Sequence, residues 1–140
     1  MIALKYVKIP DLPDFQDYDL TRKVIICGLK SERNPDSIEL LQNILRAVNI
    51  SMNTEVQVLW LEETQEIKLN VLTQDQNPRW VLAFGILPKQ LGFNMEVKLN
   101  TTVRLAYLSL LFTSPFMQLK QTKMAKKQLW EVLKINFVHE

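Results

Sequence analysis

The stretch RKVIICGLKSERNPDSIELLQNILRAVN, residues 22–49, decides the fold class of this chain. It opens with a β-branched, apolar run that ends at Gly28, which is typical of a strand buried on both faces. A helix signal follows at once, because Asn34 suits the N-cap position and Pro35 the first helical position. Apolar residues then recur at helical spacing, namely Ile38, Leu41, Ile44, Leu45 and Val48. These patterns predict a buried strand over 22–29 and a helix that runs to about Asn49.

The alternation of strand and helix signals continues along the chain. Strands are predicted over 54–61, 79–84, 95–99 and 106–113, and a helical turn closed by Gly92 over 86–92. Residues 62–73 fit both a strand and a helix, and we favour a short helix. Ser114 as cap and Pro115 in the first turn begin the last helix, with a break at Thr122. We therefore expect a single α/β domain over 22–138, in three α/β/α layers around a mostly parallel sheet.

Composition indicates a globular protein. The chain has 140 residues, of which 47% are hydrophobic and 23% charged, with a net charge of +2. That length suits one core of ordinary size. No apolar run approaches the roughly 18 to 20 residues that a membrane helix needs, and no signal peptide pattern opens the chain. Cys27, the lone cysteine, lies within an apolar run and is expected to be a buried, inert thiol. We expect a soluble protein of the reducing cytoplasm.

Residues 1–21 differ from the rest of the chain, because prolines alternate with aspartates and argue against a helix. They are predicted to form an N-terminal arm or strap. One interpretation is a strap that lies over the domain. The other is a docking motif that binds a partner through the aromatic anchors Tyr6, Phe15 and Tyr18.

Catalytic motifs are missing from the loops that follow the predicted strands. The chain has three glycines and contains neither GxGxxG nor GxxxxGK[ST], so a phosphate cradle is disfavoured. The single histidine, His139, lies one residue from the end and excludes histidine triads and His-containing zinc motifs. The pair Glu62-Glu63 is interpreted as a solvated acidic turn. No catalytic residue, cofactor or metal site is predicted.

The last helix is rich in lysine and carries a tryptophan. A phosphate-binding surface needs a basic patch joined to base-reading groups, whereas these lysines have apolar neighbours at core spacing. A solvated helix face is therefore favoured. Trp130 shares a face with Leu133 and Phe137, which places it in the core or at an interface at the core edge. The lysines are Lys120, Lys123, Lys126, Lys127 and Lys134.

The strand-like run 108–113, the Ser114-Pro115 break and the Leu129-Trp130 pair about fifteen residues later resemble the C-terminal half of the psi subunit of the bacterial DNA polymerase III clamp loader. Upstream, Val24–Gly28 looks like the first strand of that family, Leu41–Val48 like its first helix and Glu55–Leu61 like the next strand. The resemblance covers about Lys23 to Phe137.

This resemblance implies a non-catalytic adaptor of DNA replication, without a small-molecule substrate or sequence-specific DNA contacts of its own. In the family, an N-terminal segment docks on the clamp loader, and the domain holds the chi subunit, which contacts single-stranded-DNA-binding protein. Tyr6, Phe15, Tyr18 and Trp130 are the partner-binding candidates.

Two alternatives stay open. The family's fold is similar to that of uracil-DNA glycosylases, so a nucleotide- or base-processing enzyme is one, with Glu32, Asn34 and Glu62 as its polar participants. The other is a structural protein that self-associates through the terminal helix.

Overall fold

The computed structural model describes residues 22–69, 79–105 and 108–137. These residues contain a five-stranded sheet whose strand order is β2-β1-β3-β5-β4. β1 pairs in parallel with β2 and β3, and β3 pairs in parallel with β5, whereas the short edge strand β4 is antiparallel to β5. This confirms the predicted α/β class and the mostly parallel sheet. The strands are β1 (Val24–Leu29), β2 (Val56–Leu61), β3 (Arg79–Phe84), β4 (Val103–Arg104) and β5 (Leu108–Thr113).

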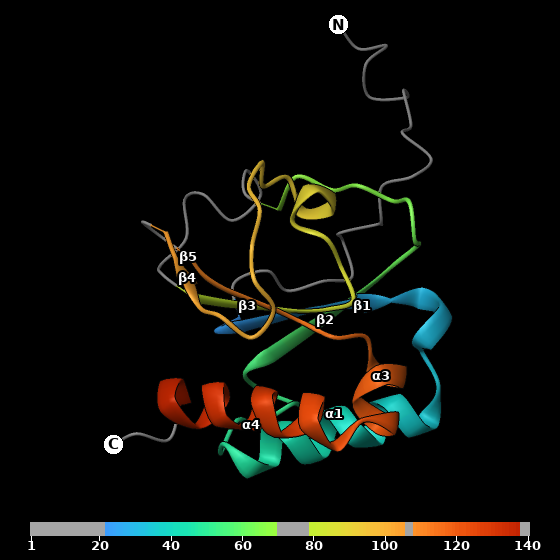
Figure 1. Cartoon of the computed structure of the whole chain (residues 1–140), viewed down its shortest axis with the longest axis vertical. Coiled ribbons are helices and arrows are strands. Elements are labelled where there is room, and N and C mark those ends of the chain that lie inside the picture. Colours follow the sequence, from blue (N-terminus) through green and yellow to red (C-terminus); the bar gives the residue numbers. More distant parts are fainter. Residues whose placement is uncertain (1–21, 70–78, 106–107, 138–140) are drawn as a thin grey trace, which may run out of the picture.

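The helices α1 (Pro35–Ala47), α3 (Phe116–Gln121) and α4 (Lys123–Phe137) lie together on one face of the sheet (Figure 1). Together with Val24 and Ile26 of β1, they bury a first core cluster. The predicted start of α1 is confirmed, because the Asn34 side chain accepts a hydrogen bond of 2.9 Å from the Ser37 N–H. The predicted break at Thr122 is also confirmed, since it separates α3 from α4. The helices contribute Leu41, Leu45, Phe116, Leu119, Ala125, Leu129 and Leu133 to this cluster.

The opposite face buries a second core cluster, which includes Ile25, Cys27 and Phe112 of the sheet. Within the described residues, extended segments and the 3₁₀ helix η4 (Pro88–Leu91) cover it (Figure 1). Strand order explains this placement. The chain runs from β1 to β2 in one direction and from β2 past β1 to β3 in the other, so right-handed crossovers lie on opposite faces. Both faces are therefore covered, but the described α-helices α1, α3 and α4 form a layer on one face alone.

Two glycines allow close packing at the strand ends. A Cβ at Gly28 would lie 2.9 Å from Cζ3 of Trp60 and 3.2 Å from Cε2 of Phe116, so glycine lets both rings pack over β1. Gly85 has a φ of +74°, and a Cβ there would lie 2.9 Å from the Pro115 Cβ. The left-handed backbone favours glycine at this position.

Three local predictions are wrong. Residues 95–99 form no strand. Met95 and Val97 pack on the second cluster while the residues between and after them are exposed, so the buried and exposed positions alternate as in a strand although the segment pairs with no other strand. Residues 62–68 are turns and irregular chain rather than helix, because Ile67 is held by a backbone hydrogen bond to Gln90, whereas Leu69 is helical as predicted. Residues 70–73 of that predicted helix lie outside the described residues. The N-cap of α3 is Pro115 rather than Ser114. The turn predicted over 86–92 is confirmed as η4, with Gly92 left-handed at its end.

Candidate protein-binding groove

The carboxyl ends of the parallel strands are where an α/β fold would build a small-molecule site. β1 lies between β2 and β3 and is parallel to both, so the chain leaves β1 in one direction for β2 and returns past it to β3. The loops after β1, β2 and β3 therefore lie at the same edge of the sheet, the carboxyl edge. Glu32, Asn34 and Glu62, the polar candidates of the enzyme hypothesis, all lie in these loops. Their contacts show what each side chain does.

Glu32 and Asn34 both cap helices. The Glu32 carboxylate accepts hydrogen bonds from the backbone N–H groups of Phe116, at 2.9 Å, and Met117, at 3.0 Å. These are the first N–H groups of α3, which have no partner inside the helix. Asn34 caps α1 in the manner described above. Both side chains thus cap helix N-termini: Glu32 caps α3 and Asn34 caps α1.

Glu62 forms an ion pair with Lys30, at 3.4 Å between Nζ and Oε2, and both side chains are exposed. Its backbone takes part in a second contact, because the Glu62 carbonyl accepts a hydrogen bond of 3.3 Å from the Gln90 side chain. The neighbouring Glu63 is exposed, consistent with the predicted solvated turn.

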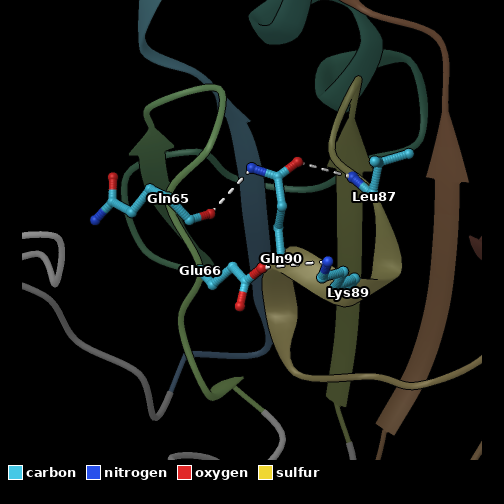
Figure 2. Close-up of polar contacts among 5 residues, drawn as sticks. All are labelled: Gln65, Glu66, Leu87, Lys89 and Gln90. Atoms are coloured by element: carbon cyan, nitrogen blue, oxygen red, sulfur yellow. Dashed lines mark hydrogen bonds and ion pairs between the residues drawn. The ribbon is translucent and has the colours of Figure 1, made fainter.

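Gln90 is the polar residue of this edge that sequence reasoning missed. Its Nε2 also donates to the Gln65 carbonyl at 3.0 Å, and its Oε1 accepts from the Leu87 N–H at 3.1 Å. Figure 2 shows its side chain between Gln65 and Leu87, with the exposed Lys89–Glu66 ion pair beside it. Gln90 is only 6% exposed and joins the two crossovers on the second face. A lone glutamine carries no motif, so no pattern in the sequence marks it.

The helical face of the molecule holds an apolar groove between α1 and α4, which we call the α1–α4 groove. Its volume is about 270 Å³. One wall is the α1 stripe Leu40, Asn43, Ile44 and Ala47, whose spacing of i, i+3, i+4 and i+7 is that of one helix face. The other wall is formed by Lys126, Leu129 and Trp130 of α4. The sequence offers one sign of this groove, since Leu40 and Ala47 widen the apolar stripe of α1 beyond the core-facing residues.

Trp130 is the predicted partner-binding residue that the structure describes, and it lies in this groove. Its ring is partly buried and packs at the edge of the first core cluster. The Lys134 ammonium lies 5.9 Å from the ring centroid, within the range of a cation–π contact. Trp130 therefore lies at the edge of the core, as one of the two predicted placements had it, and its partner-binding role stays a prediction. Tyr6, Phe15 and Tyr18 lie outside the described residues.

The charge around the α1–α4 groove is uneven. All five lysines named above are exposed, as predicted for a solvated face. Lys126 lines the groove itself. On α1, Asp36 and Glu39 are exposed one turn before the lining residues Leu40 and Asn43. The α4 side is thus basic, and the first half of the α1 side is acidic.

Cys27 is fully buried in the second core cluster, as predicted, and burial raises the pKa of its thiol to about 12. A thiol with so high a pKa is a poor nucleophile at neutral pH. In residues 22–69, 79–105 and 108–137, no three or more His, Cys, Asp and Glu side chains are grouped to hold a metal ion. None of the helices described is both long and apolar enough to cross a membrane.

No protein-family model and no curated protein matches this chain.

Proposed function

We propose that this protein is a non-catalytic adaptor that binds other proteins, and that the α1–α4 groove is one of its binding surfaces. The main support for this proposal is the groove. It is apolar, open to solvent and continuous with the first core cluster, and it includes a tryptophan, a residue enriched among those that dominate binding energy at interfaces. The polar candidates at the carboxyl edge of the sheet are engaged in helix caps and an ion pair, which supports a binding role over the enzyme alternative.

The resemblance to the psi family sharpens this proposal to the DNA replication machinery. The protein would link the clamp loader to a chi-like partner and, through it, to single-stranded-DNA-binding protein in the cytoplasm. Two of the residues that carry the resemblance, Leu129 and Trp130, line the α4 wall of the groove. The arm residues Tyr6, Phe15 and Tyr18 would dock on the clamp loader.

We also propose the finer architecture that the resemblance implies, three α/β/α layers similar to those of uracil-DNA glycosylases. The order of the parallel strands, β2-β1-β3-β5, and the crossovers on both faces support it.

The test is complex formation with purified subunits. Full-length protein is mixed with the reconstituted clamp loader and a chi-like subunit from the same cell, and co-elution is measured by size-exclusion chromatography with light scattering. The adaptor proposal expects a complex with both partners. A chain that elutes alone at micromolar concentrations contradicts the replication role, and a defined homo-oligomer favours self-association instead.

A further inference from the structure

We propose that the α1–α4 groove binds an amphipathic helix of a partner protein, and that the acidic flank of this helix lies over α4. The inference rests on the proposed adaptor function and names the partner chemistry that its groove would recognise.

The size of the groove suits a few side chains. Its volume of about 270 Å³ lies at the lower end of typical ligand pockets, which are roughly 300 to 1,000 Å³. The α1 wall extends from Leu40 to Ala47, about 10 Å at the rise of an α-helix. That length matches two apolar side chains spaced i, i+3 or i, i+4 on a docked helix. The apolar walls would take these anchors out of water.

The charge of α4 favours an acidic occupant. Lys123, Lys127, Trp130 and Lys134 follow each other at i, i+4, i+7 and i+11, so three exposed lysines share one helix face with the tryptophan. Between Phe116 and Phe137 the chain carries five lysines and a single acid, Glu131. Carboxylates of a bound helix would pair with this side of the groove.

The acids of α1 favour a peptide over a nucleic acid. Asp36 and Glu39 are exposed, and each precedes a lining residue by one helical turn. A nucleic acid is negative along its whole backbone and would be repelled on this side. A helix can present acids on one flank and neutral or basic residues on the other. The acids lie only before the α1 wall, whose own residues are uncharged, and the last turn of α1 carries the basic Arg46. The acidic start of α1 and the lysines of α4 thus favour a peptide over a nucleic acid and favour one orientation of that peptide.

The two features of the groove act differently on binding. Exposed ion pairs contribute little affinity and weaken with salt, whereas desolvated apolar anchors supply most of the binding free energy. We expect the anchors to determine affinity and the lysines to determine charge preference and salt dependence.

The test uses the full-length chain and two designed, fluorescein-labelled helical peptides of identical length. Both carry the same leucine and phenylalanine stripe; one has glutamates on one flank, and the other has lysines at those positions. Fluorescence anisotropy measures their affinities at low and moderate salt. We expect the glutamate peptide to bind at least about tenfold more tightly, with a preference that shrinks as salt screens the charges.

Two variants locate the site. Ala47→Trp fills the groove from an exposed helical position and should weaken the glutamate peptide about tenfold or more, because the anchors lose their place. The double variant Lys126→Glu, Lys127→Glu should remove most of the preference between the peptides. The double variant Lys68→Glu, Lys98→Glu is the matched control, since it reverses two exposed charges in the segments that cover the opposite face. Circular dichroism confirms folding of each variant.

Several outcomes overturn the inference. Equal binding of both peptides contradicts the preference for an acidic helix. If Ala47→Trp leaves peptide binding unchanged, or if no binding is detected up to about 1 mM, the groove is not the binding site. Tight binding of a labelled single-stranded oligonucleotide that depends on Lys126 and Lys127 but not on Ala47 assigns the surface to nucleic acid. Failure of the adaptor function is distinguishable: wild-type protein would then bind the glutamate peptide yet form no clamp-loader complex. Conversely, if Ala47→Trp and the double variant Lys126→Glu, Lys127→Glu both still form the clamp-loader complex, the adaptor function stands and the α1–α4 groove is not its binding surface.

Discussion

Replacing Gln90 with leucine tests how the two crossovers on the second face are held together. Gln90→Leu keeps the approximate side-chain size but removes three hydrogen bonds, to the carbonyls of Glu62 and Gln65 and from the Leu87 N–H. The contact to Gln65 is buried, so losing it costs about 1 to 3 kcal/mol for a desolvated carbonyl left unpaired. The other two are part-buried and contribute about 0.5 to 1 kcal/mol each. We expect a total destabilisation of about 2 to 5 kcal/mol.

The assay is urea unfolding followed by tryptophan fluorescence, with the free energy extrapolated to water. Gln90→Glu should be worse than Gln90→Leu, because it removes both donors and turns a carboxylate toward two carbonyl oxygens. Gln42→Leu, an exposed change on α1, is the control and should stay within about 0.5 kcal/mol of wild type. If Gln90→Leu were no more destabilising than this control, the reasoning about the bridge would be refuted.

Other structural contacts lead to three further predictions. Glu32→Ala removes the cap of α3 and should lower the free energy of unfolding by about 1 to 2 kcal/mol in the same urea assay, while the exposed Glu63→Ala should have almost no effect. A loss equal to that of Glu63→Ala would contradict the capping role. Gly28→Ala brings a methyl group against Trp60 and Phe116 and should lower the melting temperature, with a cost of about 1 to 3 kcal/mol; an unchanged temperature would mean that the rings move aside freely. Cys27 should resist a thiol reagent at pH 8 until the protein is unfolded. Since burial raises the folded pKa of this thiol from 9.0 to about 12, only the unfolded state ionises between those values, so stability should fall as pH rises from 9 to 12. Cys27→Ala should lack that component of the decline, and a native thiol that reacts at once would refute its burial.

Secondary structure was predictable where local signals agreed. β1 and α1 follow from an apolar run, a capping asparagine and a proline within a few residues of each other, and the structure places them as expected. Residues 62–68 and 95–99 were mispredicted because their apolar residues pack from irregular segments. Periodicity reports which side chains are buried, and it cannot distinguish a paired strand from an extended loop with the same alternation.

The groove was only partly predictable. Trp130 and the lysines stand out in the sequence, but the helical spacing of Ile44 does not show that this side chain both packs on the first core cluster and lines the groove. How α1 and α4 lie against each other depends on the packing of all the residues between them. No pattern within either helix contains that information.

By itself, the sequence determined the α/β class, the start of α1, the break at Thr122 and the inert thiol of Cys27, because each depends on residues that are neighbours along the chain. Tertiary structure alone decided that Glu32 caps a helix 84 residues away and that Gln90 bridges two crossovers. It also decided that Trp130 borders an open groove rather than a closed core. Such contacts arise only when strand order and crossover handedness bring distant segments together, and hydrogen bonds and packing then act over a few ångströms of space, regardless of separation in sequence.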